Sequence, residues 1–278
     1  MMRKKTLNVV LFYCIASIFG FFALLPFFWM ISTSFKESGA LIIVPIRWIP
    51  EKFSIYSYEQ LFIVLGKDLI LRSILNSTFV SVMVTLITLL SASMAAYAFA
   101  KIEFKLKDKI FALYLATMMI PGQVTSIPIY LVLRKLDLID SFTGLIIPTI
   151  FNAFAVFLLR QNMNNIHNDF IDAAIIDGSS HPGVFKNVIV PLSAPILASL
   201  GVITFMGTWN DYYWPLIILN SKMKMTLPLA LNLLNGQYST RYNILMAGSL
   251  ISMVPIILIY LFAQKYFETG LQVGGLKA

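Results

Sequence analysis

The sequence predicts an all-α integral membrane protein, and its composition and its apolar runs both support this fold class. The chain has 278 residues, of which 58% are hydrophobic and only 12% charged, and its mean hydropathy is +0.80. A soluble domain with so few charges would not keep its surface hydrated. A bilayer core about 30 Å thick needs about 20 consecutive apolar residues per helix, so a chain of this length can supply about six crossings. It then has no room for a soluble catalytic domain.

Six apolar runs are long enough to cross a bilayer. We treat 1–278 as a single transmembrane domain whose spans lie near 9–31, 74–98, 110–133, 142–160, 194–219 and 243–264. The first run follows a basic cluster, as in a signal peptide, but it exceeds the usual apolar region of about 7 to 15 residues. No small-x-small cleavage site ends it before Pro26. We therefore expect a retained first span.

Six spans place both chain ends on the same side of the membrane. Lysine and arginine number 11 on the side of the chain ends and 10 on the other, so their raw count does not fix the orientation. Their density favours one orientation, because three crowd residues 3–5 and four lie within 101–109. Short basic connections tend to stay in the cytoplasm. We expect both termini and the connection 161–193 to be cytoplasmic.

The net charge of +8 does not by itself indicate nucleic-acid binding. The basic residues form short clusters between apolar runs, where lysines that flank membrane helices normally lie. Cys14 is the only cysteine, so no internal disulfide can form. His167 and His181 lie fourteen positions apart, without the spacing or the cysteine partners of a metal site. We expect contact with membrane lipid, but with neither nucleic acid nor metal.

The sequence lacks the Gly-x-x-x-x-Gly-Lys-Ser/Thr loop that cradles nucleotide phosphates. It also lacks a recognisable set of nucleophile, base and orienting group, so we do not expect an enzyme. The apolar stretches 9–31 and 243–263 carry no charge, and Asp211 is the most deeply placed acid elsewhere. Proton- and sodium-coupled carriers usually need such groups near mid-bilayer, so their scarcity counts against ion coupling.

Prolines and glycines interrupt several of the expected spans. They are Pro26, Pro121, Gly122, Pro128, Pro148, Gly201, Gly207, Pro215, Gly248 and Pro255. A broken helix is tolerated in lipid where protein or a water-filled cavity satisfies the freed backbone groups, which favours a transport path. The alternative is that these residues are simply commoner in membrane helices than in soluble ones.

The connection 161–193 is predicted to form a short helix, a break and a second short helix. Asn168 or Asp169 can cap the first helix, and Asp172 lies near its positive amino end. Gly178 supplies the permissive backbone that ends a helix, and Pro182 can open the next helix in its first turn. We therefore expect a small helix lying across the membrane face.

Phe170, Ala173 and Ala174 fall at i, i+3 and i+4, so they share one face of this small helix. A side chain of one methyl lets another protein approach the helix backbone closely, as docking into a cleft requires. The alternative is an ordinary amphipathic connector that rests on the lipid headgroups. Spacing alone does not decide between these two interpretations.

Short motifs are spread along nearly the whole chain. The loop carries the motif Asp172-Ala173-Ala174, Asp177-Gly178, Phe185, Pro191-Leu192 and Pro195. This motif resembles the Glu-Ala-Ala loop of the permease subunits of binding-protein-dependent ABC importers. The further matches, 95–101, 118–123, 157–161, Trp209-Asn210-Asp211 and 270–277, resemble the carbohydrate branch of this family, which contains the maltose-type permeases. The usual first Glu is Asp172 here, and the usual small residue after the Gly is Ser179.

The resemblance implies a six-transmembrane-helix permease in a prokaryotic cell membrane, whose loop is a coupling helix seated in a groove of a cytoplasmic ATPase. Its implied docking residues are Phe170, Asp172, Ala173, Ala174, Asp177, Gly178 and Phe185. The implied partners are a second homologous permease, two copies of the ATPase, and an extracellular or periplasmic sugar-binding protein. ATP and Mg would be bound by the ATPase, and this chain would bind no cofactor.

Sugar sites pair aromatic surfaces with a few fixed hydrogen-bonding groups. The candidates for a substrate path are Asn76, Gln123, Asn152, Trp209, Asn210, Asp211 and Tyr213. An aromatic belt at the outer interface is the alternative for the 209–213 group, and a satisfied packing role is the alternative for the other three. The expected substrate is an oligosaccharide, with a polyol or a glycerol phosphate ester left open.

Two other functions remain to be compared with an importer subunit. A stand-alone secondary carrier would share the general polytopic pattern, and uptake driven by an ion gradient without an ATPase would identify it. An intramembrane enzyme would need paired catalytic groups within the spans, which this sequence does not supply.

Overall fold

The structure is a computed structural model that describes residues 2–37, 47–235 and 241–272. The predicted tail motif at 270–277 extends beyond these residues, from 273 onward. The chain divides into two compact units, which we describe separately. Unit 1 comprises Met1–Ile70 and Ala230–Val254, and unit 2 comprises Leu71–Leu229 and Pro255–Ala278.

Every element among the described residues is helical, in agreement with the predicted fold class. In chain order the elements are α1 (Met2–Ser34), α2 (Tyr56–Leu65), α3 (Lys67–Lys101), α4 (Lys107–Ala116), η1 (Thr117–Met119), α5 (Gly122–Lys135), α6 (Phe142–Ile146), η2 (Ile147–Ile150), α7 (Ala153–Asn164), α8 (Asp169–Ile176), α9 (His181–Val184), η3 (Phe185–Ile189), α10 (Val190–Leu192), α11 (Ala194–Trp209), α12 (Tyr213–Ile218), η4 (Lys222–Lys224), α13 (Leu227–Asn232) and α14 (Tyr242–Gln272).

In unit 1 the buried amide of Asn243, at the start of α14, joins segments that are far apart in the sequence. It donates to the carbonyl oxygen of Lys36 at 3.1 Å and to Oγ of Ser57 at 3.1 Å. The Ser57 hydroxyl in turn donates to the same Lys36 carbonyl oxygen. The described apolar side chains of α1 that precede Pro26 are mostly exposed, as expected for a helix whose solvent is lipid or a partner helix.

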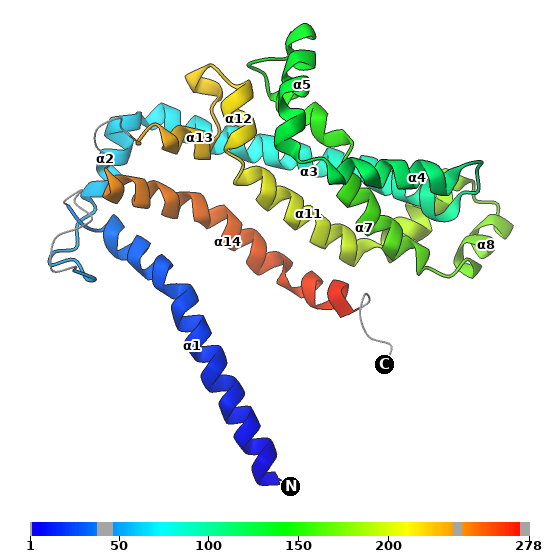
Figure 1. Ribbon diagram of the computed structural model, residues 1–278, viewed down its shortest axis with the longest axis horizontal. Helices are drawn as coiled ribbons and strands as arrows, with labels where there is room; N and C mark the ends of the chain where they lie inside the picture. Colours follow the sequence, from blue (N-terminus) through cyan, green and yellow to red (C-terminus); the bar gives the residue numbers. More distant parts are fainter. Residues whose placement is uncertain (1, 38–46, 236–240, 273–278) are drawn as a thin grey trace. The chain divides into compact units, whose positions relative to one another are not determined.

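In unit 2, α4, α7, α8 and α11 pack on the carboxyl-terminal half of α3 (Figure 1). The α3 side of this core is made by Ala92 and Ala96, both fully buried. Small side chains let membrane helices approach closely, where dispersion contacts replace the hydrophobic effect as the main attraction. Leu159 and Met163 of α7, both fully buried, belong to the same core.

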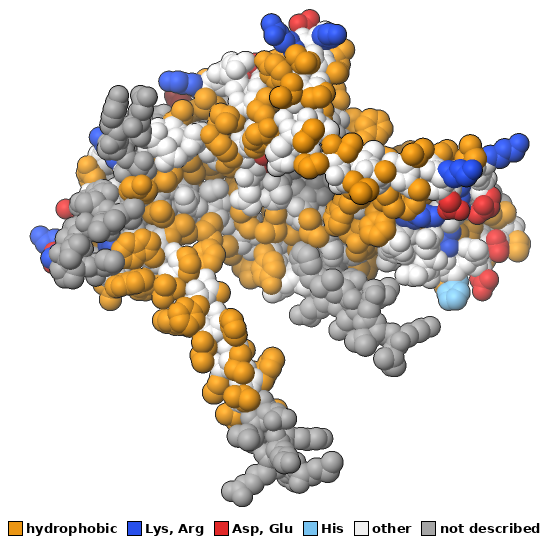
Figure 2. Space-filling view, in the orientation of Figure 1, with side chains coloured by type: hydrophobic (Ala, Val, Ile, Leu, Met, Phe, Trp, Pro, Cys, Tyr) orange, Lys and Arg blue, Asp and Glu red, His pale blue; other side chains and the backbone are white. Residues whose placement is uncertain are grey.

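Charged side chains in unit 2 are concentrated in a few places. Figure 2 shows lysine, arginine, aspartate and glutamate side chains gathered where α4 and α8 lie, and further basic side chains over the tip of α5. The last turn of α5 carries Arg134 and Lys135. Hydrophobic side chains cover much of the face between these groups. This distribution is typical of a protein whose middle lies in hydrocarbon and whose charged groups lie at or beyond the headgroups.

Three helical stretches are long and apolar enough to span a membrane: Val9–Ser34, Lys67–Lys101 and Tyr242–Gln264. The predicted spans 110–133 and 142–160 correspond to pairs of helices that are bent at a short break, and a third bent pair joins the end of the predicted connection 161–193 to the first helix of the predicted span 194–219. The bends are 101° between Lys107–Met119 and Gly122–Lys135, 42° between Phe142–Ile150 and Ala153–Asn164, and 78° between His181–Leu192 and Ala194–Trp209. The described residues thus hold three such spans, or up to six if each bent pair is one span.

Three expected spans, 110–133, 142–160 and 194–219, are therefore not continuous helices, and 142–160 breaks between Ile150 and Ala153. The interval 110–133 turns at Pro121, which cannot donate a backbone N–H and so interrupts the helix. The interval 194–219 ends its first helix at Trp209, and α12 begins only at Tyr213. The Pro and Gly interruptions in the sequence pointed to breaks, but they did not show how large each bend would be.

Candidate functional site: the 161–193 loop and a threonine-lined cavity

The connection between α7 and α11 contains the predicted short helix, α8. Its carboxyl end is closed as the sequence predicts, by Gly178 in the left-handed region at φ +86°. The N–H of Gly178 donates to the Ile175 carbonyl oxygen, and the N–H of Ser179 donates to that of Ala174. These two bonds form a Schellman motif, which satisfies the last carbonyl groups of the helix and turns the chain sharply.

The predicted side-chain cap at the other end of α8 is wrong. Asn168 precedes the helix, but no side-chain hydrogen bond caps it, and Asp169 is already its first residue. The Oδ1 atom of Asn168 instead accepts a hydrogen bond from Nζ of Lys101, at 2.9 Å. A charged donor makes a stronger bond than a backbone N–H, so the amide oxygen pairs with α3 rather than with its own helix.

The two faces of α8 have different surroundings. Ile171 is buried in the core of unit 2, and Ala174 packs half-buried against it. Phe170 and Ile176 are 54% and 85% exposed, and Ala173 is also exposed. The carboxylates Asp169, Asp172 and Asp177 are exposed as well. One face of the helix therefore anchors it, while the other presents apolar and acidic groups outward.

The second half of the connection is a bent helical run. Pro182 lies in the first turn of α9, as predicted, and η3 is a π-helix of five residues. Pro191 has no N–H to donate to the carbonyl oxygen of Asn187, which interrupts the α-helical hydrogen bonding there. The ring of Phe185 packs on that of Tyr97 with centroids 5.5 Å apart. Phe185, predicted as a docking residue, thus lies partly buried behind the exposed face.

A second feature of unit 2 is a cavity of about 270 Å³ between α3, α11 and the segment that joins η2 to α7. It is lined by Val84, Thr88, Thr149, Asn152, Phe154, Leu200, Ile203, Thr204, Gly207 and Thr208. None of these side chains is charged. The four threonines were not among the predicted site residues, although Thr204 and Thr208 recur at i and i+4 on one helix face, a signal that the sequence contains.

Asn152 is the predicted substrate-path residue that lines this cavity. It also has a structural role, because its Oδ1 accepts a hydrogen bond from the N–H of Ala155 at 3.0 Å and caps α7. The cap uses only the amide oxygen, so the amide NH2 group of this cavity-lining residue can donate other hydrogen bonds.

The other predicted substrate-path residues make contacts within the chain or lie on its surface. Trp209 is only 1% exposed and stacks on Phe205 at a centroid distance of 5.9 Å. The hydroxyl of Tyr213 lies 3.0 Å from Oγ of Ser126. The Asn210 amide donates to the Met206 carbonyl oxygen, and Oδ1 of Asp211 accepts from the N–H of Trp214. Gln123 is exposed near the start of α5, and the Asn76 amide donates to the carbonyl oxygens of Met223 and Met225.

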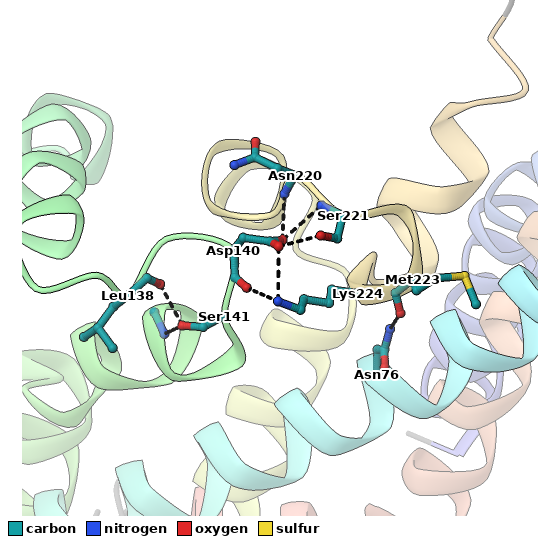
Figure 3. A network of polar contacts seen from close by, with 9 residues as sticks. Asn76, Leu138, Asp140, Ser141, Asn220, Ser221, Met223 and Lys224 are labelled. Carbon is teal, nitrogen blue, oxygen red and sulfur yellow. Dashed lines mark hydrogen bonds and ion pairs between the residues drawn. The ribbon is translucent and has the colours of Figure 1, made fainter.

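A polar network joins the loop before α6 to the loop after α12 (Figure 3). The Asp140 carboxylate accepts from the backbone N–H groups of Asn220 and Ser221, each at 3.0 Å. It also accepts from the Ser221 hydroxyl at 2.5 Å and from Nζ of Lys224 at 3.1 Å. These donors, the Ser221 hydroxyl foremost, hold the pKa of Asp140 well below its usual range, although partial burial acts in the opposite direction.

No group of three or more His, Cys, Asp or Glu side chains that could hold a metal comes together in the described parts of the chain.

Comparison with known proteins gives the family. The model of the family described as "Binding-protein-dependent transport system inner membrane component" matches residues 87–273. The arabinooligosaccharides transport system permease protein AraQ of Bacillus subtilis is 36% identical over 256 residues, covering 91% of this chain and 90% of the relative. Its counterpart in Halalkalibacterium halodurans is 34% identical, covering 93% of this chain and 92% of the relative.

A solved structure supports the same assignment. The crystal structure of a bacterial ABC transporter involved in the import of the acidic polysaccharide alginate contains a chain with a TM-score of 0.81 and 26% identity, which covers 95% of this chain and 98% of that one. These findings confirm the predicted fold class and the predicted role of a membrane permease whose ATPase is a separate subunit. The chain belongs to the family of inner membrane components of binding-protein-dependent transport systems.

Proposed function

We propose that this chain forms half of the transmembrane pathway of an ATP-driven carbohydrate importer and receives the motion of a cytoplasmic ATPase through its 161–193 loop. A second homologous permease forms the other half, an external sugar-binding protein delivers the substrate, and two ATPase copies bind ATP and Mg. Both termini and the loop lie in the cytoplasm. The chain spans the cell membrane of its prokaryotic host six times, near residues 9–31, 74–98, 110–133, 142–160, 194–219 and 243–264.

The single observation that carries the docking role is the two-sided character of α8. A helix that rests on lipid would turn its apolar residues toward the membrane. In α8, Ile171 is instead buried against the protein itself. The helix nevertheless leaves Phe170 and Ile176 exposed beside the carboxylates of Asp172 and Asp177. Anionic headgroups would repel these carboxylates, whereas a protein groove with basic and apolar walls would accept the whole face.

The cavity supports the pathway role. Its volume of about 270 Å³ lies below the range of about 300 to 1,000 Å³ that is usual for a complete small-molecule site. Two of its lining side chains, Phe154 and Ile203, are 44% and 47% exposed, so its walls continue onto the surface. A facing permease would complete the enclosure, and the two walls together would form the passage.

The chemistry of the cavity favours a neutral sugar. Threonine hydroxyls and the Asn152 amide can exchange hydrogen bonds with sugar hydroxyls, and the half-exposed ring of Phe154 offers a flat apolar face. No cationic side chain lines the cavity to neutralise a phosphate ester. The arabinooligosaccharide permeases among the relatives agree with an oligosaccharide as the substrate.

Docking is tested at Gly178 in the reconstituted complex. Gly178→Glu adds negative charge beside Asp172 and Asp177, and we expect the ATPase to be lost from the purified complex while the permease stays inserted in the membrane. Gly178→Asn is the matched control, because asparagine tolerates the left-handed backbone at this position and adds no charge. Binding of the ATPase to the Glu variant at wild-type level would show that docking takes place elsewhere.

The pathway is tested at Asn152. Asn152→Ser keeps an oxygen that can cap α7 but removes the amide from the cavity, so the thermal stability should hold while the oligosaccharide uptake falls by about tenfold or more. Asn152→Ala should lower both, because it removes the cap as well. Normal uptake by the Ser variant would exclude the amide from the sugar path. Uptake by this chain alone in liposomes, driven by a proton or sodium gradient, would contradict the importer itself.

A further inference from the structure

Lys101, at the carboxyl end of α3, binds the part of the 161–193 loop that precedes α8. Its Nζ donates to the backbone carbonyl oxygen of Ile166 at 2.6 Å and to Oδ1 of Asn168 at 2.9 Å. Both acceptors lie just before α8 begins. A lysine ammonium held between two oxygens fixes the position of this turn more firmly than a neutral hydrogen bond would.

One turn earlier, α3 binds the loop again, beyond α8. The hydroxyl of Tyr97 lies 3.2 Å from Nδ1 of His181, the first residue of α9. The Tyr97 ring packs on Phe185, and Tyr97 itself is buried in the core of unit 2. The two contacts bracket α8, so a displacement of α8 must move the end of α3 with it.

The opposite part of α3 binds a different loop. The Asn76 amide donates to the carbonyl oxygens of Met223 and Met225 at 2.9 and 3.0 Å. One residue on, the Ser77 hydroxyl accepts from the N–H of Leu227 at 2.7 Å. The same loop carries Ser221 and Lys224, which bind Asp140 (Figure 3). Asn76 and Lys101 are separated by about 38 Å of helix at about 1.5 Å per residue.

The helices that flank the 161–193 loop are poorer routes for motion. The segment His181–Leu192 meets α11 at a bend of 78°, and α7 meets the segment before it at a bend of 42°. Bends of this kind can absorb a displacement by changing a few backbone angles. By contrast, α3 runs unbroken from Lys67 to Lys101 and contains neither glycine nor proline.

We propose that α3 transmits the ATPase-driven displacement of the 161–193 loop to the loop 220–227, with Lys101 and Tyr97 as the positioning residues at one end and Asn76 and Ser77 at the other. This inference rests on the docking role proposed above. It assigns these four polar side chains to coupling, not to contact with the sugar. It also implies that the 220–227 loop of unit 2 is displaced together with the 161–193 loop when the ATPase moves.

The coupling is tested in proteoliposomes that contain the complete transporter. For Lys101→Ala we expect the ATPase to remain bound, while the sugar transported per ATP hydrolysed falls by about tenfold or more, because the variant loses both hydrogen bonds of the charged Nζ. Lys101→Arg should restore most of the yield, because arginine can reach the same two oxygens. Lys105→Ala removes an exposed lysine from the next turn of the chain and should leave the yield unchanged.

A distance measurement separates transmission from a merely structural role. Spin labels are attached at Asn187→Cys in the 161–193 loop and at Lys222→Cys in the 220–227 loop, in a Cys14→Ser background. Pulsed electron paramagnetic resonance then measures the distance between the two loops. If α3 acts as a rod, the distance distribution keeps its position between the nucleotide-free and the ATP-bound transporter. In the Lys101→Ala and Asn76→Ala variants the distance distribution should broaden or shift between the two nucleotide states.

The outcomes are distinct. A change in the distance between the two labels of the otherwise wild-type transporter, from one nucleotide state to the other, would contradict the proposal that α3 acts as a rod. An unchanged transport yield per ATP in Lys101→Ala would contradict it as well. Loss of ATPase binding in Lys101→Ala would mean that the lysine only maintains the docking surface, and the inference would again be wrong. Tyr97→Phe keeps the ring contact and removes one hydroxyl, so it provides the same test if Lys101→Ala does not fold. Failure of the proposed docking would appear instead as normal ATPase binding by Gly178→Glu.

Discussion

The Asp140 carboxylate accepts hydrogen bonds from two backbone N–H groups, a hydroxyl and a lysine, and it thereby ties together two loops that are eighty residues apart. Its backbone has a positive φ of 54°, which asparagine and aspartate tolerate better than other residues. Asp137 has a similar φ of 55° but is exposed. The two residues form a natural pair for measuring what the Asp140 network contributes.

We expect Asp140→Asn to lower the free energy of unfolding by about 1 to 3 kcal/mol, since hydrogen bonds to a charged group are lost. Asp137→Asn should leave it nearly unchanged. Thermal unfolding in detergent measures both. Because the pKa of Asp140 is lowered in the folded protein, its carboxylate stabilises the fold above the ordinary carboxyl pKa of about 4 and loses this effect as the pH falls further. The difference between wild type and Asp140→Asn should therefore shrink below about pH 4.

Residues differ in how well their roles could be predicted. The role of Gly178 was predictable, because an αL helix end needs little more than the local sequence. The role of Asn168 was not, since its partner Lys101 comes from a different helix. The indole ring of Trp209 is of a kind that stacks on sugars, but it is buried against Phe205. Only the packing of the whole unit could show that the ring is buried.

At the scale of elements, α8 combines an anchored face and an exposed face within eight residues. Ile171 and Ile176 offer the same side chain on the two faces, at 8% and 85% exposure. We expect Ile171→Ala to destabilise the permease by about 2 to 5 kcal/mol, as usual for a buried isoleucine. Ile176→Ala should leave the melting temperature unchanged and weaken ATPase binding. Equal effects of the two substitutions on stability would contradict the two-faced helix.

Apolar periodicity located the membrane helices but not their interruptions. Hydropathy averages over a window, so 110–133 and 194–219 were each predicted as one span. The structure turns the first at Pro121 and ends the first helix of the second at Trp209. The direction after a break depends on which neighbours satisfy the freed backbone groups, and a single sequence does not contain that information.

At the scale of the whole molecule, composition was sufficient for a helical membrane protein, and the motifs from Asp172 to Pro195 were needed for its family. The docking partner could be inferred only through that resemblance, because an exposed amphipathic helix has the same composition whether it meets lipid or protein. The threonine-lined cavity required the three-dimensional arrangement of α3, α7 and α11.

The proposed membrane topology gives a further prediction. In a Cys14→Ser background, a cysteine at exposed Ile176 should react with a membrane-impermeant maleimide only after the cells are opened, because we place this loop in the cytoplasm. A cysteine at Lys222 should react in intact cells, since Lys222 lies in the loop that we place outside. Reaction of both positions from the same side would contradict six crossings with cytoplasmic termini.

The length of α3 has one more consequence. Its 35 residues extend for about 52 Å, whereas a helix tilted by about 40° needs only about 39 Å to cross a hydrocarbon layer of about 30 Å. At least a turn or two of the helix therefore stands clear of the lipid tails. In the topology that we propose, these turns carry Lys101 and the loop that it binds into the aqueous layer, where a water-soluble ATPase would reach them without touching the bilayer.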